Sequence, residues 1–220
     1  MTQPTALAPP SQKRRQAMTY QEWLAMPDEG TQSEWVDGEV IVFMPPTGIH
    51  QDIAGFLYIL LQVFVRHHNL GLVRQAPFEM RLSPAVSREP DILFLARPHL
   101  DRLTPQRLDG PADLVVEIVS ADSVRRDRVL KFAEYAAAGV PEYWLLDPRP
   151  GHQRAEGFRL TGGTYAAVPA TPDGRIQADV LPGFWLQPAW LWQDPLPDPL
   201  ACLREIAPDL LASSSPQAGS

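Results

Sequence analysis

One ionisable residue interrupts the most strand-like segment of the chain. Glu117 lies in the middle of the run Asp113-Leu-Val-Val-Glu-Ile-Val-Ser120, and Pro90-Asp91 opens a second apolar run upstream. A buried, ionised carboxylate costs several kcal/mol unless a cation or hydrogen bonds compensate its charge. Two acids on neighbouring core strands therefore predict that a positive group binds between them, and a hard divalent metal ion is the first candidate.

Composition limits the classes of protein to which the chain can belong. Its 220 residues are 45% hydrophobic, and the mixture of strand and helix patterns predicts a single α/β (α+β) domain at 18–207 between disordered tails at 1–17 and 208–220. The lone Cys202 excludes an internal disulfide framework and a cysteine-rich zinc site, so a cytoplasmic location is expected. The longest apolar stretch, Ile53 to Val65, is shorter than the roughly 20 residues that cross a bilayer, which predicts a core helix and no membrane contact.

The charge of the chain also bears on its partners. A net charge of −7 argues against a protein that holds nucleic acid by bulk electrostatics. It does not exclude an enzyme whose acids hold metal ions and whose basic residues line a single groove. The residues that form such a local basic cluster are Arg125, Arg126, Arg128 and Lys131.

Turn, cap and periodicity signals predict the order of the elements. Thr19 caps a short helix that ends near Pro27, and Asp37-Gly38 is typical of a tight hairpin between strands at 34–36 and 39–43. The core should then run α-β-β-β-α-β, as a mixed sheet flanked by helices. The expected core elements are a helix from His50 to His68, strands at 72–82, 91–96 and 114–119, a helix from about 123 to 138, and a strand at 142–147.

The connections and the C-terminal part are predicted from Gly and Pro punctuation. A long loop should join the second and third core strands, and an aromatic β extension after Pro148 should cover one edge of the sheet. A short helix is expected at 200–206. His67 and His68 are expected to end the long helix without any chemical role.

The two acids and one lysine form the candidate site. If the strands of Asp91 and Glu117 are adjacent and in register, both carboxylates reach one Mg²⁺ from the same side of the sheet. The alternative is that Asp91 caps a turn and Glu117 faces solvent on an edge strand. Lys131 lies four residues after Asp127, a spacing typical of an ordinary surface pair, but its helix follows the Glu117 strand directly and returns across the sheet toward the acids.

Taken together, these motifs resemble the Uma-two family, which is classed with the restriction endonucleases in the PD-(D/E)XK nuclease superfamily. The resemblance covers roughly Thr19 to Leu186, and the α-β-β-β-α-β order is also the core of that superfamily. The segments that carry it are Glu34-Trp-Val-Asp-Gly-Glu39, Met44-Pro-Pro46, His50-Gln51, Pro90-Asp91, Asp113 to Ser120, Arg126-Asp-Arg-Val-Leu-Lys131, and Tyr135 through Gly139-Val-Pro-Glu-Tyr-Trp144 to Asp147-Pro148.

The resemblance implies roles for individual residues. Asp91 matches the PD aspartate and Glu117 the second acid, both of which are metal ligands in such nucleases, and the Ile118 carbonyl completes the implied ligand set. The usual lysine two residues after the second acid is absent, because Val119 occupies that place. Lys131, on the following helix, matches the position to which this lysine has migrated in the family.

Three further positions are accessory candidates for the same site, two of them through the resemblance. Glu34 matches an upstream acid that resembles an accessory metal-site glutamate of the superfamily. His50 matches a family histidine without an assigned role. Asp127, one turn before Lys131, is the third accessory candidate.

The function expected on these grounds is hydrolysis of DNA phosphodiester bonds by a Mg²⁺-dependent endonuclease, with Mn²⁺ able to substitute and with a 5′-phosphate product. One alternative is a catalytically silent nuclease fold that serves as a binding or assembly module, including a homodimer formed through the β extension. Another is a nuclease for RNA or repair intermediates. The sequence leaves the recognition sequence, the strandedness of the substrate, the pathway and the oligomeric state open.

Overall fold

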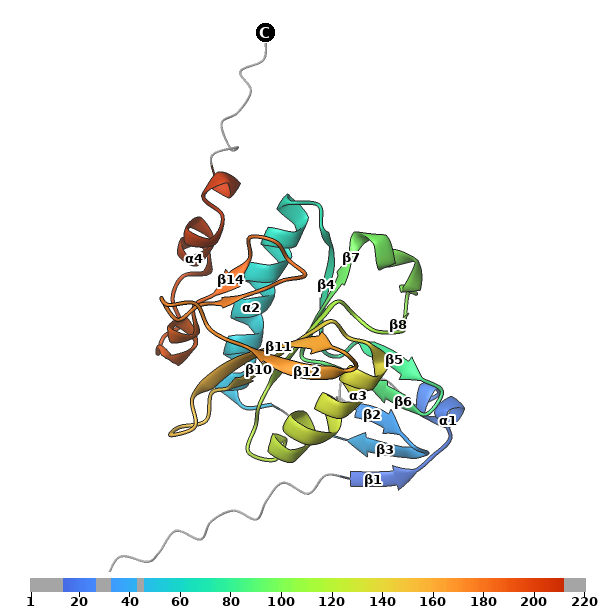
Figure 1. The fold of residues 1–220 in the computed structure, drawn as a ribbon. Coiled ribbons are helices and arrows are strands. Elements are labelled where there is room, and N and C mark those ends of the chain that lie inside the picture. Colours follow the sequence, from blue (N-terminus) through green and yellow to red (C-terminus); the bar gives the residue numbers. More distant parts are fainter. Residues whose placement is uncertain (1–13, 27–32, 43–45, 212–220) are drawn as a thin grey trace, which may run out of the picture.

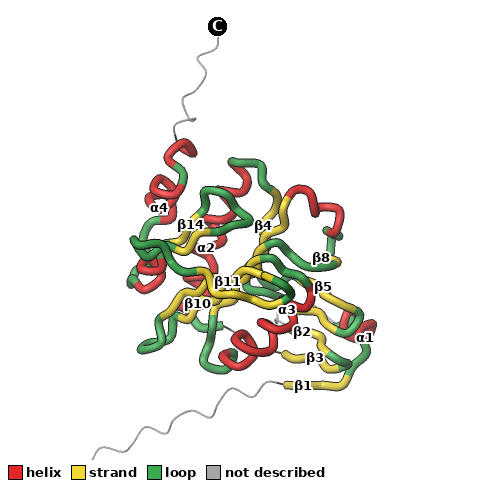
Figure 2. The backbone as a smooth tube through the Cα atoms, viewed as in Figure 1, coloured by secondary structure: helices red, strands yellow, loops and turns green. Residues whose placement is uncertain are grey.

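The structure is a computed structural model that describes residues 14–26, 33–42 and 46–211. The segments 1–13 and 212–220 of the predicted tails, and the predictions that concern Pro27, Phe43 and Met44, lie outside the described residues. Within them, two six-stranded sheets with helices against them form a mixed α/β fold, as the sequence predicts (Figure 1). Figure 2 shows the strands of both sheets in yellow and the helices in red.

The first sheet is built around the predicted hairpin. Asp37 and Gly38 have φ angles of 50° and 83°, the left-handed geometry of a type I′ turn, so the hairpin prediction is confirmed. Thr19 caps helix α1 (Tyr20–Leu24) and forms a capping box with Glu22. The strand order is β1-β3-β2-β6-β5-β8, and the strands are β1 (Arg14–Ala17), β2 (Ser33–Val36), β3 (Glu39–Val42), β5 (Glu79–Ser83), β6 (Val86–Arg88) and β8 (Arg107–Asp109).

The second sheet contains the predicted core. Helix α2 (Gly48–His67) is followed by three strands, a helical crossover and β10, so the predicted α-β-β-β-α-β order is confirmed. β9 and β10 pair in parallel and every other pair in this sheet is antiparallel. The strand order is β12-β11-β10-β9-β7-β4, and the strands are β4 (Gly71–Gln75), β7 (Ile92–Ala96), β9 (Leu114–Ile118), β10 (Glu142–Asp147), β11 (Arg154–Thr161) and β12 (Thr164–Val168).

The two faces of the second sheet carry different cores. α2 packs on the face of Ile92, Phe94 and Val116, and although it is long and apolar enough to span a membrane, its apolar stripe from Ile53 to Val65 is buried in this core. The opposite face, with Val115, Leu145 and Val119, packs against the crossover helix. The last part of the crossover helix, α3 (Phe132–Ala138), lies between the first sheet and β12 (Figure 1).

The C-terminal part confirms the predicted β extension and short helix. β11 and β12 continue the sheet beyond β10, and α4 (Pro199–Ile206) packs against α2. The remaining elements are β13 (Ile176–Gln177), β14 (Trp185–Leu186) and the 3-10 helices η3 (Pro188–Trp192) and η4 (Pro208–Leu211).

Four predictions differ from the structure. The single strand expected at 72–82 is two strands, β4 and β5, which lie on either side of Pro77 and belong to different sheets; proline has no N–H to donate to a sheet ladder. The expected long loop contains the 3-10 helix η1 (Arg97–Arg102) and β8. β1 lies in the predicted N-terminal tail but pairs with β3, and η4 lies in the predicted C-terminal tail.

The close approach of β4 to the end of β7 leaves no room for a side chain at Gly71. Its φ angle is 154°, and a Cβ there would collide with the carbonyl oxygen of Leu95 and lie 2.9 Å from the Arg97 nitrogen. We expect Gly71→Ala to lower the free energy of unfolding by at least about 2 kcal/mol. Gly55→Ala, in α2 with open space around it, is the matched control and should be neutral or stabilising in chemical denaturation. Equal free energies of unfolding for Gly71→Ala and Gly55→Ala would show that position 71 does have room for a side chain.

Candidate active site

The register of β7 and β9 brings the two predicted acids together. Ile92 pairs with Val116 in an antiparallel ladder, and continuing this register by one residue places Asp91 opposite Glu117. Residues directly opposite in such a pair carry their side chains on the same face, with Cβ atoms about 4.5–5.5 Å apart. The Asp91 carboxylate accepts a hydrogen bond of 2.7 Å from the Ile118 backbone N–H, which fixes it beside β9.

Glu117 lies in an almost fully buried environment. Its Oε1 accepts hydrogen bonds from the Lys131 ammonium at 2.8 Å and from the Tyr135 hydroxyl at 2.6 Å. Burial raises the pKa of Glu117 to about 8; Lys131 opposes this shift, and the negative charges of Asp91 and Asp127 add to it. Glu117 is therefore harder to ionise than an exposed carboxyl group, and a bound cation would favour its ionised form.

Lys131 reaches the site from a π-helical turn. Residues Arg126–Lys131 form this turn, which inserts an extra residue into the crossover helix just before α3. As a result Asp127 and Lys131 are buried while Val129 between them is 53% exposed. The Lys131 Nζ lies 2.8 Å from both Glu117 Oε1 and Glu34 Oε1, so one ammonium joins the core sheet to the hairpin.

Glu34 is completely buried on β2 and is held by two cations. Its Oε2 accepts a 2.7 Å bond from Arg88 Nη1, and its Oε1 faces Lys131. Burial raises the pKa of Glu34, but Lys131 and Arg88 outweigh that effect and lower it to about 2. The carboxylate therefore stays ionised and holds Lys131 in place, which differs from direct metal ligation.

Arg88 belongs to the site but is not among the residues predicted from the sequence. It also donates two hydrogen bonds of 2.7 Å to Glu134 on α3. The sequence feature that could have identified Arg88 is its position two residues before Pro90. Its strand also pairs with the strand that carries Glu34. That pairing of β2 with β6 depends on tertiary structure and could not be deduced from the local pattern.

The other two accessory candidates, His50 and Asp127, also lie near the acids. His50 Nε2 lies 3.2 Å from Asp91 Oδ2, and its buried Nδ1 has no hydrogen-bond partner among the described residues. Burial lowers the pKa of His50, but the bond to Asp91 and the nearby carboxylates raise it overall. Asp127 is 1% exposed, its pKa is raised by burial, and its Oδ1 accepts no hydrogen bond within the described part of the chain, although Arg126 Nε lies 3.3 Å away.

The donor chemistry of this site fits a hard divalent cation. Asp91 and Glu117 offer carboxylate oxygens on one face, and carboxylates and carbonyls are the ligands that Mg²⁺ and Mn²⁺ prefer. Burial raises the pKa values of Glu117 and Asp127, and neighbouring carboxylates add to both shifts; a bound cation would oppose them. These acids do not, however, belong to a group of three ligands within 4.8 Å of one another in the described residues, so the fit is to two carboxylates with a carbonyl and water.

The predicted basic cluster is divided by the fold. Arg125 and Arg126 line a cavity of about 410 Å³ beside the hairpin and the π turn. Arg128 instead pairs with Glu156 at 2.6 Å and with Asp147 at 3.4 Å, at a different pocket. The cavity is also lined by Asp37, Glu39, Asp122 and Glu134. Its surface is therefore of mixed sign rather than strongly basic.

The raised pKa of Glu117 predicts a pH dependence in the metal-free protein. Its carboxyl titrates near 4.5 when unfolded and at about 8 when folded, so the folded state holds more protons between these values. The resulting stabilisation is fully present below about pH 4.5 and is lost as the pH rises toward 8. The pKa of Glu34 is instead lowered to about 2. Its effect on the free energy of unfolding therefore has the opposite sign and falls at a lower pH than that of Glu117.

We therefore expect the free energy of unfolding, measured by urea denaturation with a chelator, to fall between about pH 5 and 8. Glu117→Gln should make this slope smaller without abolishing it, because Glu89, whose pKa burial and the Glu34 charge raise to about 8, contributes with the same sign. An unchanged slope in Glu117→Gln would show that Glu117 is ionised throughout.

Comparisons with known proteins bear on the family and the fold of the chain. Residues 20–189 match the model of the Uma2 family, described as "Putative restriction endonuclease". Among solved structures, the fold is similar to a crystal structure from Anabaena variabilis ATCC 29413 described as a "putative nuclease belonging to DUF820". The TM-score is 0.66 at 19% sequence identity, over 80% of this chain and 97% of the other. No significant match to a curated protein was found.

Proposed function

The chain belongs to the Uma2 family of nuclease-like proteins, and we propose that it is a Mg²⁺-dependent endonuclease that hydrolyses phosphodiester bonds of DNA. The observation that carries this proposal is the meeting of Asp91, Glu117 and Lys131 on one face of the second sheet. Two acids with one ammonium beside them are what metal-assisted phosphodiester hydrolysis requires: ligands for the cation, and a fixed positive charge for the transition state.

Asp91 and Glu117, with the Ile118 carbonyl, would hold the ion. Bound there, Mg²⁺ would act as a Lewis acid on the phosphate and lower the pKa of an attacking water. The Tyr135 hydroxyl and the Ile118 N–H each fix one of the acids through a hydrogen bond. His50 is positioned to orient Asp91, and is therefore a positioning residue in this proposal.

Lys131 is the residue that we assign to the transition state. An ammonium has three N–H donors, and two of them point to Glu117 and Glu34 at 2.8 Å. The third can donate to the attacking water or to a phosphate oxygen. Glu34 and Arg88 support this role by holding the lysine in one orientation.

The mixed charge of the neighbouring cavity bears on how substrate would be held. Three arginines and four acids line it, so backbone phosphates gain little from bulk electrostatics there. We infer that the metal ion supplies a large part of the affinity for the scissile phosphate. Binding of DNA should therefore be weak with a chelator and strengthen with Ca²⁺, which occupies oxygen sites without efficient catalysis.

A second candidate function is a catalytically silent nuclease fold that binds or assembles. It is favoured by one observation, namely that Lys131 and Arg88 already compensate the charges of Glu34 and Glu117 within the protein. Calorimetry separates the two functions, because a silent scaffold need not bind Mg²⁺ or Mn²⁺ at Asp91 and Glu117.

The direct test is cleavage by the purified full-length protein. Supercoiled plasmid, single-stranded DNA and RNA are each incubated with Mg²⁺, Mn²⁺ or a chelator. We expect nicked and linear plasmid with either metal and none with the chelator. If RNA is cleaved and DNA is not, the substrate is RNA rather than DNA. No cleavage of any substrate, together with no metal-binding heat, would support the silent scaffold instead.

A further inference from the structure

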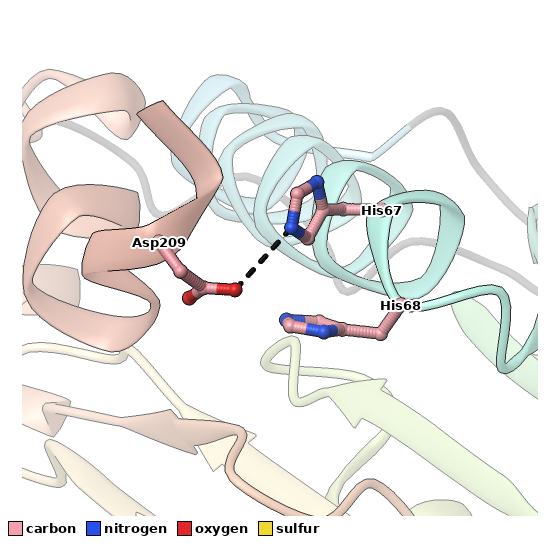
Figure 3. A group of neighbouring side chains, drawn as sticks. All are labelled: His67, His68 and Asp209. Carbon is pink, nitrogen blue, oxygen red and sulfur yellow. Dashed lines mark hydrogen bonds and ion pairs between the residues drawn. The ribbon is translucent and has the colours of Figure 1, made fainter. Parts of the chain in front are cut away.

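A second cluster of potential metal ligands lies at the far end of α2 from His50. The ligand atoms of His67, His68 and Asp209 all lie within 4.8 Å of one another, and no other group of three or more His, Cys, Asp or Glu residues meets this criterion in the described ranges. His67 Nε2 lies 3.3 Å from Asp209 Oδ2. Figure 3 shows the His67 ring facing the carboxylate of η4, with the His68 ring beside both.

His68 points to a ligand independently of this proximity. Its Nε2 is buried and has no hydrogen-bond partner within the part of the chain that the structure describes. A buried polar nitrogen without a partner is costly, and such groups usually have a bound water or ion. The ring itself is fixed, because it packs against Phe64 with centroids 4.4 Å apart and against His67 at 4.7 Å.

We propose that His67, His68 and Asp209 form a site for a transition-metal ion of the Zn²⁺ class. Two imidazole nitrogens and one carboxylate oxygen suit Zn²⁺, Ni²⁺ or Cu²⁺, whereas Mg²⁺ prefers an all-oxygen set. Three protein ligands leave one tetrahedral position for water. The site is separate from Asp91 and Glu117, and the inference is independent of the proposed nuclease activity.

The geometry needs only a small adjustment to close around an ion. Bonds of about 2.0–2.1 Å in a tetrahedron place ligand atoms roughly 3.3 Å apart. His67 and Asp209 already have this separation. All ligand atoms lie within 4.8 Å of one another, and the more exposed side chains of His67 and Asp209 are the ones that would rotate to close the site.

The position of the site indicates a structural role. His67 and His68 end α2, while Asp209 belongs to η4, which follows the α4 helix packed on α2. An ion bound by all three would join the C-terminal helices to the core. His67 lies 17 positions after His50 on α2, which places the site about 26 Å along the helix from the candidate active site, so the ion takes no part in cleavage.

The proposal is tested with metal-depleted full-length protein and Zn²⁺ or Co²⁺ alone as probes. We expect calorimetry to show Zn²⁺ binding, thermal unfolding to shift upward by several degrees at saturating Zn²⁺, and Co²⁺ to give visible absorption typical of a nitrogen-containing tetrahedral site. His68→Phe keeps a ring against Phe64 without the ligand nitrogen, and Asp209→Asn removes the charge. Each variant should weaken Zn²⁺ binding at least about tenfold.

Two controls make the outcome decisive. His152→Ala removes an exposed histidine elsewhere and should bind Zn²⁺ as the wild type does, and Asp91→Asn should retain both the thermal shift and the Co²⁺ absorption. The proposal is overturned if the wild type shows no Zn²⁺ binding, if His68→Phe and Asp209→Asn both bind like the wild type, or if Asp91→Asn is the variant that loses the signal.

Discussion

Asp91→Asn and Glu117→Gln are each expected to lose nuclease activity below detection while remaining as stable as the wild type or more so. Both acids lie on one face of the second sheet, and burial together with the neighbouring carboxylates raises the pKa of Glu117 to about 8. Each amide removes a charge that the proposed metal ion would bind, and in Glu117→Gln the Lys131 ammonium keeps Glu34 as a partner. Because it also relieves repulsion between like charges, it should not harm the fold.

The amide at position 91 keeps an oxygen for the bond from Ile118 N–H, so its structural cost is small. Asp113→Asn is the matched control: Asp113 precedes β9, is 6% exposed compared with 8% for Asp91, and bonds to Ala96 and His99. It should cleave DNA normally.

Plasmid cleavage, metal calorimetry and thermal unfolding are measured on all three variants. Wild-type rates in Asp91→Asn or Glu117→Gln would show that the metal site lies elsewhere. Equal loss of activity in Asp113→Asn would show that the assay reports stability rather than chemistry.

Features encoded within a few residues could be predicted from the sequence. The Asp37-Gly38 turn requires positive φ angles at both positions, which Asp and Gly tolerate, and this alone fixes the hairpin that carries Glu34. The spacing of apolar residues from Ile53 to Val65 fixes the buried face of α2. The place of Glu117 within β9 follows from its apolar neighbours, as does that of Asp91 beside β7, although β7 begins at Ile92 rather than at the predicted Asp91.

Features that depend on pairing between distant segments could not be predicted in this way. The run at 72–82 holds two strands, β4 and β5, on either side of Pro77, and their placement in different sheets depends on the distant strands with which each pairs. Arg128 looks equivalent to Arg125 in sequence, yet the π-helical turn directs it toward Asp147 and Glu156. The sequence places His67 and His68 at a helix end, but their proximity to Asp209 arises only when η4 packs there.

Lys131→Ala is expected to reduce cleavage by about two to three orders of magnitude, the size associated with the loss of one transition-state stabiliser. The same ammonium also compensates two buried carboxylates, Glu34 and Glu117, at 2.8 Å each. Removing one partner of a buried ion pair costs roughly 3–5 kcal/mol, although protonation of Glu117 would offset part of this. The single variant therefore mixes a chemical effect with a structural one.

Two double variants separate these effects. Lys131→Ala with Glu34→Gln removes the buried charge on β2 that Arg88 alone would otherwise compensate, so it should recover part of the stability in urea denaturation without recovering activity. Lys131→Ala with Val119→Lys restores an ammonium on the face of β9 that Glu117 occupies, because residues two apart in a strand point the same way. It should recover part of the cleavage rate, although Val119 is 1% exposed and a buried lysine costs stability.

Circular dichroism and metal calorimetry on each variant show whether it folds and binds the ion before its rate is interpreted. If Lys131→Ala cleaves at the wild-type rate, the lysine serves the fold alone. If the Glu34→Gln double variant regains activity together with stability, the loss in the single variant was structural. Recovery only in the Val119→Lys background would mean that the position of the ammonium beside Glu117 matters, and that the chain can supply it from either the strand or the helix.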